Sequence, residues 1–251
     1  MHTAIDECGF SVLPNVFGDE EVRFLIESIS KIEREEGVRT RGGVYAIRNL
    51  LHLSPTVNDF ACSAKVRSLA EEILQDRALA VRATLFDKTA GANWLVPWHQ
   101  DLTVCVQSRL DVPGYGPWTK KAGVWHVQPP ASVLERMLSV RIHLDDCGES
   151  NGVLRVLPGT HRLGRLNSAQ ITEQERIGSS VSCVVSAGGV VVMRPLLIHA
   201  SSAASNAAHR RVIHIDYASG PLDDGLHWAT ACDRRIPGHA PFRISCPEGD
   251  S

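Results

Sequence analysis

The segment VPWHQDLTVCVQ, residues 96–107, places a histidine and an aspartate two positions apart, His99 and Asp101. Residues i and i+2 of a β-strand point to the same side, so this pair would present an imidazole and a carboxylate together, as neighbouring metal ligands must. The pattern alone is not specific, because the chain contains two further pairs of this kind, His143/Asp145 and His214/Asp216.

A non-haem iron(II) site needs two histidines and one carboxylate on one face of the metal, with the other positions open. His199 follows the β-branched run GGVVVM and precedes small residues, which suits a second histidine ligand from another strand. His143 instead leads into LDDCGESNG, a composition typical of a turn. His214 lies within RRVIHIDYA, where a core histidine or a supporting group is common. Context favours His99, Asp101 and His199 without excluding the other pairs.

The bulk properties indicate one globular domain, residues 1–251, with 43% hydrophobic and 22% charged residues. The net charge is −2 and the acidic and basic residues are interspersed, which argues against nucleic acid or a membrane surface as partner. Seven scattered cysteines without a CxxC pair argue against a disulfide framework or a thiolate zinc site. No apolar run reaches the ~20 residues of a membrane span, and the N-terminus does not resemble a secretory signal. We expect a cytoplasmic protein.

The elements that must position these residues are mainly β. Helices are predicted at about 19–76, with apolar stripes in two segments, and a strand at 9–17. At least seven short β-branched segments between about 80 and 218 predict an antiparallel sandwich or jelly roll. Residues 107–130 are rich in Pro, Gly and Trp and are predicted to form a functional lid or a large surface loop. An irregular C-terminal tail follows.

Three segments of the chain resemble the phytanoyl-CoA dioxygenase family of iron(II)- and 2-oxoglutarate-dependent oxygenases. With the N-terminal GFSVLPNVFGDEEV they cover most of the chain in the expected order. The segments are ATLFDKTAGANWLVPWHQD (83–101), LSVRIHLDDCGESNGVLRVLPGTHR (138–162) and VVVMRPLLIHASSAASNAAHRRVIHIDYA (190–218). The resemblance implies a double-stranded β-helix, a cupin-like jelly roll, with Fe(II) near its mouth and 2-oxoglutarate and O2 as co-substrates. It assigns the metal ligands, which are also the catalytic residues, to His99, Asp101 and His199.

The resemblance also implies two co-substrate contacts, Ser201 and Arg210. A planar guanidinium is the natural partner of the planar distal carboxylate of 2-oxoglutarate. Arg210 and Arg211 are adjacent and point to opposite faces of a strand, and the pattern alone does not identify the barrel interior. The spacing from His199 in the family favours Arg210. The presence of Asp101 argues against halogenation, which needs a small residue there, and for hydroxylation.

The predicted substrate is an unidentified small-molecule metabolite, of secondary metabolism in our interpretation. Gln100, Trp98 and Trp125 are candidate substrate contacts, although Gln100 would equally hold the strand end and the tryptophans would equally pack the long loop. Lys88 and Arg82 could serve a carboxylate of the substrate or co-substrate, although a solvated surface charge is the favoured interpretation of Lys88. Two alternatives stay open: the same iron chemistry giving desaturation, cyclisation or epimerisation, and a non-enzymatic jelly-roll binding module. The sequence does not indicate the oligomeric state.

Overall fold

The computed structural model describes residues 2–32, 38–40, 44–205 and 209–230. The expected irregular tail falls partly on residues 231–251, which lie outside the described residues. Within the described part, no helix is long and apolar enough to cross a membrane. Cys8, Cys105, Cys147 and Cys183 are free thiols, whereas Cys62 is disulfide-bonded, which the scattered cysteines did not predict.

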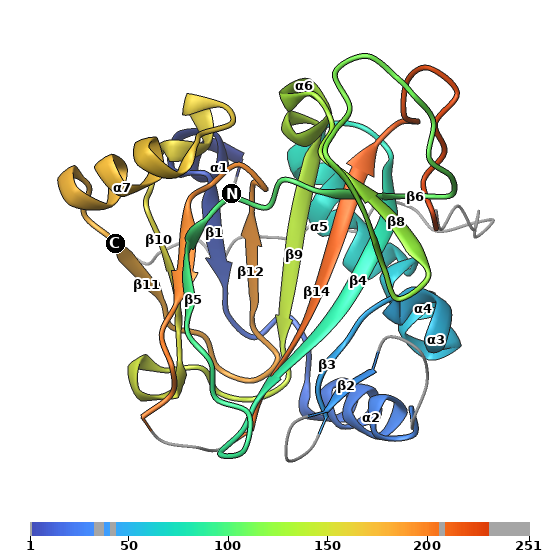
Figure 1. The fold of residues 1–251 in the computed structure, drawn as a ribbon. Coiled ribbons are helices and arrows are strands. Elements are labelled where there is room, and N and C mark those ends of the chain that lie inside the picture. The colour runs from blue at the N-terminus through green and yellow to red at the C-terminus, as the bar shows by residue number, and fades with distance from the viewer. Residues whose placement is uncertain (1, 33–37, 41–43, 206–208, 231–251) are drawn as a thin grey trace, which may run out of the picture.

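Three antiparallel sheets form the β part, and the predicted jelly roll is confirmed (Figure 1). The large sheet has the order β1 (Phe10–Leu13), β12 (Val190–Met193), β9 (Met137–His143), β14 (Arg210–Ser219), β4 (Ala78–Lys88), β3 (Val44–Ile47) and β2 (Val38–Thr40). The second sheet has the order β11 (Val181–Cys183), β10 (Leu154–Val156), β13 (His199–Ser201) and β5 (Val96–His99). The third sheet has the order β6 (Val104–Val106), β8 (Val124–Val127) and β7 (Trp118–Lys121).

The helices are α1 (His2–Cys8), α2 (Asp19–Ser30), α3 (Leu50–Leu53), α4 (Pro55–Ala61), α5 (Ala64–Leu74), α6 (Ala131–Glu135) and α7 (Ser168–Ile177). The two predicted amphipathic segments correspond to α2 and α5, each with its apolar stripe buried. Ser63 caps α5 by accepting a hydrogen bond from the Val66 amide. The sequence analysis missed α7, although Asn167 and Gln170 form a capping box at its start.

Side chains along the central strands of the large sheet alternate between an apolar outer face and a polar inner face. Ile213, Ile215 and Tyr217 of β14 belong to the main apolar cluster, which also contains residues of α2, α4 and α5. The intervening residues of β14 and its neighbours point the other way, into the barrel. On β9 and β14 these inward residues include the buried polar side chains Ser139, Arg141, His143, Arg210, His214 and Asp216. The helices therefore supply the hydrophobic core on the outside of the sheet, and polar groups line much of its inner face.

Residues 107–130 differ from the predicted loop. They contain a β-hairpin, β7–β8, which pairs with β6 to form the third sheet. The turn uses Ala122 and Gly123, both with positive φ, as a two-residue hairpin turn requires. Because Ala122 is an unusual residue for that conformation, the hairpin carried little sequence signal.

Candidate metal centre

His99, Asp101 and His199 meet at one place in the barrel. One potential ligand atom from each lies within 4.8 Å of the others. The antiparallel pairing of β5 with β13 places His99 directly opposite His199, with ring centroids 4.2 Å apart. The Asp101 carboxylate lies 3.8 Å from His99 Nε2 and 3.6 Å from His199 Nε2. The structure thus brings together the three residues singled out in the sequence.

Backbone carbonyl groups orient both histidine rings. His99 Nδ1 lies 2.8 Å from the oxygen of Pro97, and His199 Nδ1 lies 2.9 Å from the oxygen of Leu197. A carbonyl oxygen can only accept, so each Nδ1 donates its proton and each Nε2 keeps a lone pair. Histidines that bind metals usually make such a second contact, which sets the tautomer and the ring direction. Both Nε2 atoms are therefore prepared to act as ligands.

The electrostatics of the group favour the ligand forms. Burial lowers the pKa of His199 to about 3, against the opposing effect of Asp101, so the ring is neutral at pH 7. Burial acts to raise the pKa of Asp101, but His199, His214, His99 and Arg82 outweigh it and hold that pKa below its usual value. A neutral imidazole and an ionised carboxylate are the species that bind a cation.

His214 approaches the same carboxylate but its nitrogens are engaged elsewhere. Its Nε2 lies 4.0 Å from Asp101 Oδ2 and 2.9 Å from Asp216 Oδ1. Arg141 Nη1 lies 2.8 Å from His214 Nδ1, and because a guanidinium only donates, Nδ1 must accept. The Nε2 proton of the neutral ring is then donated to Asp216. This leaves no lone pair for a metal, in line with a supporting group.

The hydrogen-bond partners of the remaining His-x-Asp pairs distinguish these pairs from the ligand group. Asp216 accepts hydrogen bonds from Arg82 Nε at 2.5 Å and Ser139 Oγ at 2.7 Å, so it is fully engaged in the barrel. Asp145 forms a two-point ion pair with Arg211. His143 is completely buried in the barrel and does not share a site with that aspartate. Partner geometry therefore distinguishes three pairs that the sequence pattern could not.

The donor set fits ferrous iron. Two neutral imidazoles and one carboxylate are the protein ligands typical of non-haem iron(II) oxygenases. Among the described residues, no fourth His, Cys, Asp or Glu joins this group. The described residues thus do not form the closed ligand shell of a structural metal site, and other positions around an ion would be left for small molecules.

The two neighbouring arginines of β14 have different environments. Arg211 is on the helix-facing side and its guanidinium is held by Asp145 at 2.6 and 2.8 Å. Arg210 faces the barrel interior, is 2% exposed, and donates from Nη1 to the oxygen of Gly152 at 2.8 Å. Its Nε has no partner in the structure. Arg210 is therefore the one with donor capacity left inside the barrel.

Lys88 is a second interior cation, and its interpretation as a solvated surface charge is wrong. It is paired with Arg210 in the β4–β14 register and is 1% exposed. Its Nζ donates to Ser201 Oγ at 3.0 Å and to the oxygen of Ser202. Burial, with the charge of Arg210, lowers the pKa of Lys88 to about 7. The six-residue spacing between Arg82 and Lys88 on β4 carried the signal, since both fall on one face.

This end of the barrel fits a carboxylate. Lys88, Ser201 and Arg210 provide an ammonium, a hydroxyl and a guanidinium with an unused Nε donor. Buried donors without a partner are rare, and buried cations without an acid are costly. The distal carboxylate of 2-oxoglutarate has the charge and the acceptor geometry that this arrangement lacks.

Gln100 is held entirely by the backbone. Its amide nitrogen donates to the oxygens of Gly164 and Leu196 at 2.8 and 2.7 Å, and its amide oxygen accepts from the amide of Leu166 at 2.8 Å. These contacts match the alternative in which Gln100 holds the strand end beside the metal group.

The two candidate tryptophans are also packed against the protein. Trp98 lies on the face of β5 opposite to His99, and the guanidinium of Arg155 is 5.1 Å from its ring. Trp125 makes an edge contact with Trp118 at 6.4 Å and packs against an apolar cluster beneath the third sheet. The structure does not bring either ring to the metal group.

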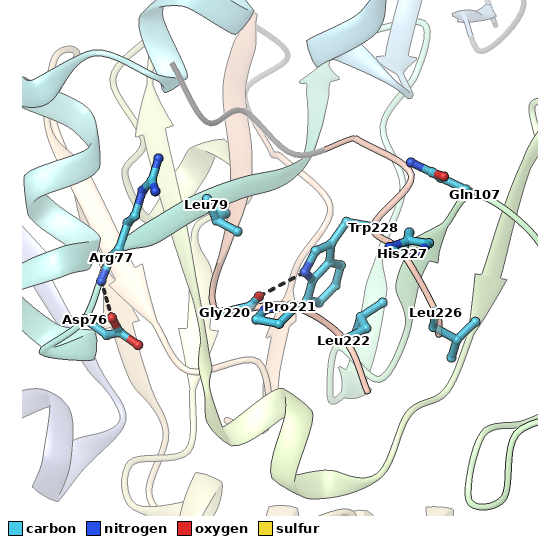
Figure 2. A pocket seen from close by; sticks show the side chains of 10 residues that line it. All are labelled: Asp76, Arg77, Leu79, Gln107, Gly220, Pro221, Leu222, Leu226, His227 and Trp228. Atoms are coloured by element: carbon cyan, nitrogen blue, oxygen red, sulfur yellow. Dashed lines mark hydrogen bonds between the residues drawn. The ribbon is translucent and has the colours of Figure 1, made fainter. Parts of the chain in front are cut away.

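Two pockets flank the barrel. One, of about 490 Å³, is lined by Leu79, Pro221 and Trp228, whose indole donates to the oxygen of Gly220, as Figure 2 shows. It contains none of the potential ligands. The other, of about 450 Å³, is lined by residues of α3, β4 and the β7–β8 turn and reaches Arg82. Arg82 in turn contacts Asp216, the partner of His214, so this second pocket adjoins the polar barrel interior.

Comparisons with known proteins identify the family of the chain. Residues 5–212 match the model of the phytanoyl-CoA dioxygenase (PhyH) family. The chain is 28% identical to L-proline trans-4-hydroxylase from Streptomyces griseoviridis, covering 83% of this chain and 82% of that protein. It is 27% identical to an ectoine dioxygenase from Bordetella bronchiseptica over 61% of this chain, but spans only 46% of that enzyme.

Solved structures share the fold. EctD from S. alaskensis superposes with a TM-score of 0.67 at 20% identity, covering 87% of this chain and 75% of EctD. The carbocyclase SnoK from nogalamycin biosynthesis gives 0.66 at 15% identity, covering 93% and 92%. With a family model matching most of its length and the ligand group assembled in the barrel, this chain belongs to the phytanoyl-CoA dioxygenase (PhyH) family of iron(II)- and 2-oxoglutarate-dependent oxygenases.

Proposed function

We propose that this protein is an Fe(II)- and 2-oxoglutarate-dependent dioxygenase that hydroxylates a small-molecule metabolite. The observation that carries the proposal is the convergence of His99, Asp101 and His199, with both Nε2 lone pairs available and the carboxylate between them. When bound, ferrous iron and 2-oxoglutarate would supply the oxidising power, with O2 consumed and succinate and carbon dioxide released.

The chain's own residues bind and orient the reactants. His99, Asp101 and His199 hold the ion. Lys88 and Arg210, together with Ser201 at the end of the ligand strand β13, bind the distal carboxylate of 2-oxoglutarate. Burial of these groups excludes water, which strengthens each charged contact. His214 lies beside Asp101, with its Nε2 4.0 Å from Asp101 Oδ2, and donates its Nε2 proton to Asp216, so neither His214 nor Asp216 is proposed as a ligand.

Two features support hydroxylation of a small molecule. Asp101 occupies a position that would have to be small for a halide ligand, so a hydroxylating ligand set is complete. The pocket of about 450 Å³ beside Arg82 is of a size that suits a metabolite. The similar curated proteins are named for hydroxylation of proline and for an ectoine dioxygenase activity, whereas SnoK, similar in fold, is a carbocyclase. Substrate placement decides between these outcomes.

The test is anaerobic titration of the purified protein with Fe(II) and then 2-oxoglutarate, monitored by the weak visible charge-transfer band of the chelate. We expect the band in the wild type, its loss in His199→Ala, and its retention in His227→Ala, which removes an exposed histidine outside the group. Addition of O2 with L-proline, ectoine and a metabolite library should release succinate and give a product 16 mass units heavier. Absence of both band and succinate would leave the binding-module alternative standing.

A further inference from the structure

The barrel interior contains more positive charge than one carboxylate needs. Besides Lys88 and Arg210, Arg141 of β9 is buried, 6% exposed. The hydrogen bonds of these three side chains go to neutral groups: the hydroxyl of Ser201, backbone oxygens and the ring of His214. No carboxylate of the described residues forms an ion pair with any of the three. Three buried cations without an ion-pair partner, although the charge of Asp101 acts on Arg141 from a longer distance, indicate a site for a ligand with more than one negative group.

The strand register separates these cations along the barrel. Arg210 pairs with Lys88 at one end of the β4–β14 ladder. Arg141 pairs with His214, four residues further along β14, so the two backbone positions are about 14 Å apart at the usual strand rise. The charged ends of the long side chains nevertheless act on one another, since the charge of Arg210 lowers the pKa of Arg141 and the charge of Arg141 lowers the pKa of Lys88. His214 Nε2 in turn lies 4.0 Å from Asp101 Oδ2. Arg141 is therefore the cation at the level of the metal group, and the Lys88/Arg210 pair is the cation pair distant from it.

Several buried polar atoms between these two levels have no hydrogen-bond partner. Both ring nitrogens of His143, which is 0% exposed, have no hydrogen-bond partner, and neither do Arg141 Nε and Arg210 Nε. His143 lies two residues from Arg141 on the same face of β9 and pairs with Val212, so it falls between the two levels. Buried polar atoms without partners usually mark a place where a ligand or water binds.

We propose that Arg141 binds the C1 carboxylate of 2-oxoglutarate, the one adjacent to the keto group, and so orients the end that chelates the metal. This rests on the proposed function, since it takes the ligand of that function as given. The two carboxylates of one dianion then meet two cationic groups at two levels of the barrel. Arg141 keeps its charge at neutral pH, because burial and Arg210 lower its pKa only to about 10. Its bond to His214 also links co-substrate binding to the carboxylate of Asp101.

The experiment compares three ligands on the zinc-loaded protein by isothermal titration calorimetry, so that no turnover intervenes. 2-Oxoglutarate carries both carboxylates, levulinate lacks the C1 carboxylate, and 2-oxopentanoate lacks the distal one. Arg141→Gln should weaken 2-oxoglutarate and 2-oxopentanoate by about 10- to 100-fold, the range of a lost charged hydrogen bond, and leave levulinate within about twofold. Arg210→Gln, the matched control, should weaken 2-oxoglutarate and levulinate instead. Arg141→Lys should recover part of the lost affinity.

The outcomes are distinguishable. If Arg141→Gln weakens all three ligands alike and lowers zinc affinity, Arg141 acts only by supporting His214 and the proposal is wrong. Unchanged affinity for 2-oxopentanoate in a variant with wild-type thermal unfolding would equally overturn it. Failure of the wild type to bind 2-oxoglutarate at all would instead reject the proposed function, and this inference with it.

Discussion

The buried ammonium of Lys88 predicts that binding of 2-oxoglutarate takes up a proton. In the free protein, burial and the charge of Arg210 lower the pKa of Lys88 to about 7, so about half of the molecules carry a protonated Lys88 at pH 7. A bound carboxylate returns the pKa toward its ordinary value, so only the protonated form binds tightly. Affinity is therefore full below pH 7 and lost as pH rises through 7. Linkage then raises the dissociation constant about 25-fold between pH 6.5 and pH 8.5.

The assay is titration of the anaerobic Fe(II) protein with 2-oxoglutarate across that pH range, with calorimetry in two buffers of different ionisation enthalpy to count protons. Lys88→Met should bind more weakly at pH 6.5 and show a flat profile. Lys88→Arg is the matched control, because a guanidinium stays charged and should give a flat profile with affinity retained at pH 8.5. A wild type without proton uptake, or a Lys88→Met variant that keeps the slope, would refute the reasoning.

Three further predictions concern neighbouring residues. Arg210→Gln should weaken the affinity for 2-oxoglutarate by about 10- to 100-fold, measured by titration of the charge-transfer band. Arg211→Gln breaks a partly exposed ion pair, so it should leave this affinity unchanged and lower the free energy of unfolding by no more than about 1 kcal/mol. Gly152→Ala, at φ +66°, would place a Cβ 2.8 Å from a backbone oxygen and 3.2 Å from the Lys88 ammonium, so thermal melts should show a loss of about 1–3 kcal/mol together with weaker co-substrate binding. Asp216→Asn leaves the largely buried Arg82 without its acid and should lower the free energy of unfolding in urea by about 3–5 kcal/mol. Arg82 and His214 hold the wild-type pKa of Asp216 far below its usual value, despite burial. The stabilisation by Asp216 is therefore present above about pH 4 and declines as pH falls, and the variant should lack this decline.

The strands were largely predictable from local patterns, whereas the ligand set was assigned by the family resemblance, with local context only favouring it. Each β-branched segment that was identified between about 80 and 218 overlaps a strand of the structure. His199 was favoured because its surroundings are those of a strand followed by small residues. His143 was disfavoured because a turn composition follows it, but it ends strand β9 and is buried in the barrel, so only the structure separates it from the ligand group.

The choice between Arg210 and Arg211 could not be made from the strand pattern, and the reason is physical. In RRVIHIDYA both faces contain apolar residues, so alternation does not say which face is inside. The answer depends on α2, α4 and α5, which bury Ile213 and Tyr217 on the outer side of the sheet. Lys88 was misjudged for the same reason: its face of β4 is identified only once Arg210 is known to be its cross-strand partner.

The placement of the helices also explains how the barrel can hold so many charges. A charged interior opposes folding, since each buried ion loses hydration. Here the aliphatic residues of β9, β12 and β14 pack outward against helices, in one large cluster that does not involve the site. That cluster stabilises the sheet through its outer face. The inner face can therefore carry polar and charged side chains that bind a ligand. Burying Lys88, Arg141 and Arg210 destabilises the free protein, and a bound dianion offsets this by pairing with the three cations. The missing ion pairs of the free protein are therefore formed on binding, which favours a doubly charged ligand over a singly charged or neutral one.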